Sequence, residues 1–210
     1  MAADGRRRGA GIVFVIDDDE SVCAALSSLL RALGWQVRTF ASAAAFLEFE
    51  RPNLPACIVL DVRLPAKSGL ELQRELAGGA DAPPIIFMSS FGDIPMTVQA
   101  MRAGAVEFLP KPFREEDLLA AIEGAIERDA GARAARAGLA GLQQRIASLS
   151  SREHEVMLLI VQGHLNKQVA AALGITEATV KVHRRHVMEK MLAKSLPDLV
   201  RLVERVQPTA

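Results

Sequence analysis

Cysteine is scarce in this chain: Cys23 and Cys57 are the only two in 210 residues. Neither forms a CxxC pair or stands in a cluster with histidine, which is the spacing that disulfide frameworks and structural zinc sites require. The sequence therefore excludes both kinds of scaffold. We expect two buried thiols in a reducing compartment.

Long apolar runs are also missing. A membrane-spanning helix needs about 20 consecutive apolar residues, and no stretch of the sequence approaches that length. Three arginines at 6–8 precede the apolar run 11–16 and imitate a signal peptide, but three aspartates end that run after too few residues. We expect a soluble, cytoplasmic protein with no membrane partner.

The chain has no formal net charge, but the charge is unevenly distributed. Residues 1–130 contain 13 Lys and Arg against 19 Asp and Glu, whereas residues 131–210 contain 12 against 6. A net charge of −6 thus precedes one of +6. A basic C-terminal part is typical of a small domain that binds DNA, although solvated helix faces explain the same charge.

Short apolar runs alternate with longer amphipathic stretches as far as residue 128. This alternation is typical of a doubly wound parallel sheet. We predict five strands at 12–16, 36–40, 57–60, 85–88 and 106–109. Five helices are expected near 20–33, 43–50, 70–76, 95–103 and 115–128. Residues 11–130 are therefore predicted to form an α/β domain with a five-stranded doubly wound parallel sheet.

The composition changes at residues 131–147, which are rich in Ala, Arg, Gly and Gln. We expect a partly helical linker there. Ser150 and Glu153 then have the spacing of a capping box, and helix signals follow at 166–173, at 176–191 and from Ser195 onward. Residues 148–208 are predicted to form an all-α, four-helix domain that contains a helix-turn-helix.

Polar residues follow the predicted strands, and they include Asp17, Asp18, Asp61, Ser89 and Lys111. The carboxyl ends of parallel strands meet at one edge of the sheet, so these side chains are expected to share a cleft. Neighbouring carboxylates repel unless a hard cation joins them, and Mg²⁺ suits such a pocket. One carboxylate can then act as a nucleophile on a phosphoryl group, with the serine hydroxyl bonding a phosphoryl oxygen.

Other interpretations of these acidic residues remain open. Asp17-x-Asp19 imitates the motif of haloacid-dehalogenase phosphohydrolases, although Glu20 stands where that family has Thr or Val and no late Asp-Asp pair follows. A regulator that ignores phosphorylation is a further alternative, and the complete set of polar groups disfavours it. A purely structural role as a helix cap fits Asp19 but not the acidic residues jointly.

Several strings within residues 11–130 resemble the receiver family of response regulators, and specifically its FixJ-like subset. They are VIDDDE at 15–20, LDVRLP at 60–65 with Ser68-Gly69, FMSS at 87–90 and AGAVEFLPKPF at 103–113. The resemblance implies a CheY-like receiver that accepts a phosphoryl group from a sensor histidine kinase. Ser90-Phe91 departs from the subset, which often has Gly-His there, so the phosphate lifetime stays open.

The resemblance also implies a role for each residue of the acidic site. Asp61 is the phosphoacceptor, Asp18 a direct Mg²⁺ ligand, and Asp17 a ligand largely through water. The backbone carbonyl of Arg63 would supply a further protein ligand to Mg²⁺. Mg²⁺ is therefore the expected cofactor.

Further residues match the family's switch. Ser89 stands where the family has Thr or Ser, Phe108 at its aromatic switch position, and Lys111-Pro112 at a cis peptide. Phosphate on Asp61 is expected to draw Ser89 inward while Phe108 fills the vacated space, which is a two-state change. The family dimerises through its fourth helix and fifth strand, which points here to Val98, Met101, Arg102 and Glu107.

The basic C-terminal part contains a candidate DNA-reading helix. Thr176 is expected to cap a helix on which Lys181, Val182 and Arg185 point together. Such a face suits the DNA major groove, where Lys or Arg donates to guanine and a small apolar group meets the thymine methyl. An ordinary basic surface would explain the charge but not the surrounding helix-turn-helix.

The strings LSSREHEV at 149–156, NKQVA at 166–170 and TVKVH at 179–183 resemble the LuxR-type (NarL/FixJ) DNA-binding family. The resemblance implies that the helix from Glu177 reads bases through Lys181, Val182 and Arg185. The candidates for phosphate contacts are Asn166, Lys167, Thr179 and Arg184. The last helix is expected to pair two copies on DNA through Leu199, Val200 and Val203.

Together the two resemblances imply a response regulator of the FixJ/NarL type and not an enzyme. On phosphorylation of Asp61 it is expected to dimerise, bind promoter DNA and activate transcription, with RNA polymerase as a further partner.

Overall fold

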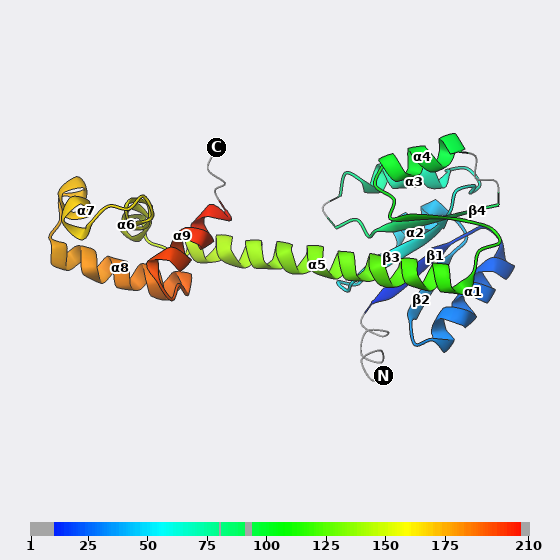
Figure 1. Ribbon diagram of the computed structural model, residues 1–210, viewed down its shortest axis with the longest axis horizontal. Coiled ribbons are helices and arrows are strands. Elements are labelled where there is room, and N and C mark those ends of the chain that lie inside the picture. The colour runs from blue at the N-terminus through cyan, green and yellow to red at the C-terminus, as the bar shows by residue number, and fades with distance from the viewer. Residues whose placement is uncertain (1–10, 80, 91–93, 207–210) are drawn as a thin grey trace. The chain divides into compact units, whose positions relative to one another are not determined.

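Five short strands form one parallel sheet in the first part of the chain. The computed structural model describes residues 11–79, 81–90 and 94–206, and Figure 1 shows its elements. The strand order is β2-β1-β3-β4-β5, and every pair is parallel. The strands are β1 (Ile12–Ile16), β2 (Gln36–Phe40), β3 (Ala56–Asp61), β4 (Ile85–Ser89) and β5 (Glu107–Pro110). The predicted fold class is thus confirmed.

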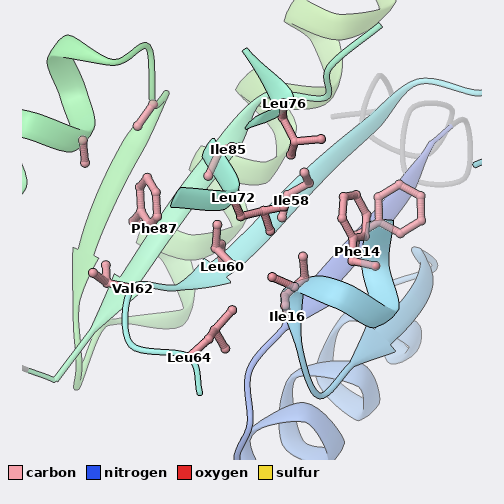
Figure 2. Close-up of a cluster of buried hydrophobic side chains, with 14 of the residues drawn as sticks. Phe14, Ile16, Ile58, Leu60, Val62, Leu64, Leu72, Leu76, Ile85 and Phe87 are labelled. Atoms are coloured by element: carbon pink, nitrogen blue, oxygen red, sulfur yellow. The ribbon is translucent and has the colours of Figure 1, made fainter. Parts of the chain in front are cut away.

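The central strands are buried because helices cover both faces of the sheet. Helices α2 (Ala43–Glu48), α3 (Gly69–Leu76) and α4 (Ile94–Arg102) supply side chains to the core on one face. Helices α1 (Glu20–Ala32) and α5 (Glu115–Ala147) supply side chains to the core on the other face. Figure 2 shows Leu72 and Leu76 of α3 among the apolar side chains of β1, β3 and β4.

Helix α5 is longer than predicted. The expected helix at 115–128 and the expected linker at 131–147 form one continuous α5. Alanine, arginine, leucine and glutamine are good helix formers, and no proline interrupts them. Leu142 of the expected linker lies buried in the core of the C-terminal helices. Contacts divide the described chain into two units after Arg133. The boundaries 11–130, 131–147 and 148–208 stay predictions, and residues 207–208 lie outside the described part.

The middle of α5 is fixed to the sheet by a buried carboxylate. Asp129, only 2% exposed, accepts a hydrogen bond from the backbone N–H of Ala56 at 2.8 Å. The same carboxylate accepts one from Arg133 at 2.7 Å, and Arg133 also donates to the side chain of Asn53. These bonds join the start of β3 to α5 within the first unit.

The second unit has the predicted helices: α6 (Ser151–Val161), α7 (Asn166–Leu173), α8 (Glu177–Met191) and α9 (Leu196–Glu204). Ser150 and Glu153 form the expected capping box on α6, and Thr176 and Ser195 cap α8 and α9. Gly174 ends α7 with a φ of 66°, a left-handed conformation that glycine adopts readily. This turn separates the two helices of the helix-turn-helix.

The expectations about cysteine and about membrane-spanning helices can be compared with the structure. Cys23 and Cys57 are buried and free, as predicted, and burial raises the pKa of both thiols. Within the described ranges, none of the helices combines the length and apolar character that crossing a bilayer requires.

Leu192 provides a test of backbone strain. It ends α8 with a φ of 54°, and its side chain is 63% exposed. A left-handed conformation is unfavourable for residues with a Cβ, so Leu192→Gly should stabilise the C-terminal domain by about 0.5–1 kcal/mol. Thermal unfolding should show a Tm increase of about 2–8 °C. Leu192→Ala is the control, because it removes the side chain but keeps the Cβ; an equal gain there would contradict the explanation.

Candidate functional site

Three carboxylates meet at the carboxyl edge of the sheet. Oxygen atoms of Asp17, Asp18 and Asp61 all lie within 4.8 Å of one another. Lys111 Nζ, from the segment after β5, donates to Asp17 Oδ2 at 2.7 Å and to Asp61 Oδ2 at 2.9 Å. The side chain of Asp17 is buried, that of Asp61 is 14% exposed, and Asp18 is exposed. The structure thus brings together the acidic residues and the lysine that the sequence predicted.

The environment of Lys111 keeps it cationic. Burial by itself would lower the pKa of this amine, but its hydrogen bonds to Asp17 and Asp61 outweigh burial and hold the pKa above the ordinary value of 10.5. Three carboxylates and one ammonium leave a formal charge of −2 at the cluster. A divalent cation would neutralise that charge.

The donor set fits Mg²⁺, which prefers carboxylate oxygens and keeps several waters. The exposed Asp18 leaves the cluster open on the solvent side. The backbone N–H of Arg63 donates to Asp61 Oδ1 at 3.0 Å, which orients the central carboxylate. The Arg63 carbonyl stays a predicted ligand.

Helix α3 begins directly against the backbone of Asp61. A Cβ added to Gly69 would lie 2.5 Å from the Asp61 carbonyl oxygen and 3.0 Å from the ring of Phe87. Real side chains do not approach a carbonyl so closely, so only glycine fits there. The N–H of Gly69 also donates to the carbonyl of Val62 at 2.9 Å. The Ser68-Gly69 string therefore positions α3 on the segment that carries the predicted phosphoacceptor.

The predicted switch residues lie on β4 and β5. Ser89 is 1% exposed at the end of β4, and its carbonyl accepts a hydrogen bond from the N–H of Lys111 at 2.7 Å. Phe108 is partly buried on β5, with its ring centroid 6.2 Å from that of Phe87. The Lys111-Pro112 peptide is cis, as the family resemblance implied. Phe91, which departs from the subset, lies outside the described residues.

The predicted receiver dimer face is exposed. Val98 and Met101 of α4 each expose 41% of their surface, and Ile94, which was not predicted, exposes 80%. Arg102 and Glu107 are exposed as well. These residues offer an apolar surface with charged neighbours, so their role in dimerisation stays a proposal.

The predicted base-reading residues share an exposed side of α8. Lys181 and Arg185 are exposed, and Val182 exposes 46% of its surface. Two candidates for phosphate contacts bond to each other, because Arg184 donates to Asn166 Oδ1 at 3.2 Å. Lys167 is exposed and Thr179 Oγ1 lies 2.8 Å from the hydroxyl of the helix cap Thr176.

Glu153 has a second role that the sequence did not reveal. Besides capping α6, this 5% exposed carboxylate accepts a hydrogen bond from Lys190 Nζ at 2.6 Å, and His186 Nδ1 lies 3.4 Å from its other oxygen. Lys190 and His186 are both on α8. The hydrogen bonds from Lys190 and from the Ser150 backbone hold the Glu153 pKa at about 2. A capping residue thus fixes the predicted recognition helix to α6.

The prediction for the last helix needs correction. Leu199 is 0% and Val203 6% exposed, and both belong to the core that α9 forms with α6 and α8. Residues four apart share one side of a helix, and on α9 that side faces its own domain. Neither residue offers surface to a second copy. Val200 is partly exposed and keeps its predicted role as a proposal.

Comparison with known proteins agrees with this arrangement. Residues 13–123 match the family described as "Response regulator receiver domain", and residues 147–203 match "Bacterial regulatory proteins, luxR family". The chain belongs to the FixJ/NarL-type response regulators. It is therefore a two-component transcription regulator with a receiver and a LuxR-type DNA-binding domain. Membership in this family of transcription regulators disfavours the phosphohydrolase alternative.

Relatives of the regulator span almost its whole length. It is 51% identical to Nodulation protein W of Bradyrhizobium diazoefficiens, over 92% of this chain and 85% of that protein. It is 46% identical to Response regulator protein TodT of Pseudomonas putida, over 94% and 87%. The solved structure of Response Regulator StyR is 50% identical, with a TM-score of 0.87, and covers 94% of this chain and all of its own.

Replacing Glu153 tests its second role. Its folded-state pKa lies below the ordinary 4.5, so its contribution to stability is present in full above about pH 4.5 and is lost as the pH falls toward 2. Glu153→Gln should destabilise the DNA-binding domain by about 1.5–3 kcal/mol at pH 7 and flatten the pH dependence of unfolding between pH 5 and 2. Urea unfolding at several pH values measures both effects.

Glu155→Gln is the matched control for this measurement. Glu155 pairs with Arg152 on the same helix, but both side chains are about half exposed. Such a pair contributes little, so the control should change stability by less than about 0.5 kcal/mol. Equal effects of the two variants would contradict the assigned role of Glu153.

Proposed function

We propose that Asp61 accepts a phosphoryl group from a sensor histidine kinase, and that the phosphorylated regulator dimerises and binds promoter DNA to activate transcription. The observation that carries the proposal is the cluster in which Lys111 bridges Asp17 and Asp61 while Asp18 faces solvent. Such a cluster offers a carboxylate nucleophile together with positive charge for phosphoryl oxygens.

The chemistry follows from these positions. Asp17, Asp18, Asp61 and the Arg63 carbonyl would hold Mg²⁺, which would supply positive charge against the phosphoryl oxygens. A carboxylate oxygen of Asp61 attacks phosphorus and forms an O–P bond. The N–P bond to the kinase histidine breaks, and its electron pair stays on the imidazole nitrogen. Lys111 then donates to a phosphoryl oxygen.

The change at Asp61 would reach the dimer face through the switch residues. The Ser89 hydroxyl moves toward the new phosphoryl oxygens, and Phe108 turns into the space beside it. This rearrangement alters the surface of Val98, Met101, Arg102 and Glu107, which pairs with a second copy. Packed cores support such discrete states better than gradual bending.

In the second domain, Lys181, Val182 and Arg185 enter the major groove. Asn166, Lys167, Thr179 and Arg184 contact phosphates. Helix α9 supports pairing of two DNA-bound copies through Val200. A promoter-bound regulator of this kind would work with RNA polymerase in the cytoplasm.

Asp61→Asn should abolish labelling by acetyl phosphate, because an amide is too weak a nucleophile to form the O–P bond. A mobility shift on a phosphate-affinity gel measures the labelling. Asp81→Asn, at an exposed aspartate away from the cluster, should be labelled like the wild type. Labelling that persists in Asp61→Asn would move the phosphoacceptor elsewhere.

Arg185→Ala should reduce the discrimination between target and random DNA by about 1–3 kcal/mol, because it removes a donor to a base edge. Fluorescence anisotropy at fixed salt, on a site selected from random DNA, measures both affinities. Arg201→Ala on the exposed side of α9 is the control and should leave the discrimination unchanged. A uniform loss on all sequences would instead make Arg185 a phosphate contact.

A further inference from the structure

A glutamine is buried between α3 and α4. Gln73 of α3 is only 3% exposed, and its Nε2 donates to the backbone carbonyl of Ala100 in α4 at 3.0 Å. Its Oε1 is buried and has no hydrogen-bond partner among the described residues. An apolar residue would satisfy the core equally well at this position, so a half-satisfied polar side chain needs an explanation.

The carbonyl that Gln73 contacts lies at the junction of α4 and β5. Ala100 is in the last turn of α4, and its oxygen also accepts the N–H of Ala105 at 3.1 Å. The next residue, Val106, bonds through its N–H to the carbonyl of Ile85 on β4 at 2.8 Å. Gln73 therefore bonds to the last turn of α4, just before the chain turns toward β5.

Gln73 shares one side of α3 with Gly69, which lies against the backbone of the predicted phosphoacceptor Asp61. Gly69 and Gln73 are four residues apart, so they lie on one side of α3. Gly69 is packed against the Asp61 carbonyl, as the 2.5 Å distance for an added Cβ shows. One turn of helix thus separates the contact with Asp61 from the contact with Ala100.

Helix α4 has little apolar packing. Of its described residues, Ala100 is buried and Met96 packs partly buried against the core, while Ile94, Val98 and Met101 are exposed apolar residues. A helix with so little buried surface opens or shifts more easily than its neighbours. A buried hydrogen bond to its last turn then helps to set the position of the end of α4.

We propose that Gln73 is a positioning residue that tethers the end of α4 to α3, so that a change at Asp61 reaches the α4–β5 face through α3 as well as through Ser89 and Phe108. The tether itself is a property of the unphosphorylated receiver. Its coupling to Asp61 rests on the proposed function. The two parts can therefore be measured separately.

The first experiment is hydrogen–deuterium exchange on the full chain without phosphorylation. Gln73→Met keeps the length of the side chain but cannot donate to Ala100. We expect the peptide covering 94–105 to exchange about threefold to tenfold faster, which corresponds to the loss of one hydrogen bond. Peptides over α3 and β1 should keep their wild-type rates. Gln36→Met, the same change at an exposed position of β2, should leave all peptides unchanged.

The second experiment compares DNA affinity with and without acetyl phosphate. In Gln73→Met we expect Asp61 to be labelled at the wild-type rate, while the gain in DNA affinity on phosphorylation falls about threefold or more. A merely structural role would lower the Tm without changing this ratio. Gln73→Leu, with a smaller apolar side chain, is a second variant in case the first does not fold.

Unchanged exchange over 94–105 in a folded Gln73 variant would overturn the tether. Faster exchange with an unchanged affinity ratio would overturn the coupling. Failure of the proposed function would look different, since wild-type Asp61 would then not be labelled, and the exchange experiment would still decide whether Gln73 holds α4.

Discussion

The ammonium of Lys111 lies between the carboxylates of Asp17 and Asp61 and thereby allows three acidic residues to occupy one edge of the sheet. These groups come from the ends of β1, β3 and β5, so the same contacts join three strands where their carboxyl ends meet. Repulsion among the carboxylates would otherwise favour their separation. The cluster is consequently both a constraint on the fold and a source of negative charge that a cation and a phosphoryl group can use.

Around this edge the receiver combines tightly and loosely held parts. Gly69 allows α3 to approach the Asp61 carbonyl more closely than any other residue type would permit. Helix α4, by contrast, buries little and exposes Ile94, Val98 and Met101. Under the proposed function, a change that starts at the rigid site would produce a discrete response where packing is weakest, at the α4–β5 face.

The sequence predicted the strands and the acidic cluster well because both depend on local patterns: short apolar runs, and polar residues directly after them. The continuation of α5 was harder to predict, because no proline marks an end and glycines suggested a linker. Glu153 was recognised as a cap, but its bond to Lys190 joins residues far apart in the sequence. Leu199 and Val203 were assigned to a dimer surface because the family resemblance implies a role for the last helix without showing which of its side chains the domain's own core covers.

Strand β3 explains why a change at Asp61 would affect α4 more than the middle of α5. Its carboxyl end carries Asp61, whereas at its start the N–H of Ala56 is bonded to Asp129 of α5. Arg133 satisfies the same carboxylate and also reaches Asn53. A buried charge with several hydrogen bonds resists displacement, because breaking them would leave it uncompensated. The middle of α5 is therefore anchored at the edge opposite the acidic cluster, and under the proposed function the response to phosphorylation would fall on the face of α4 and β5.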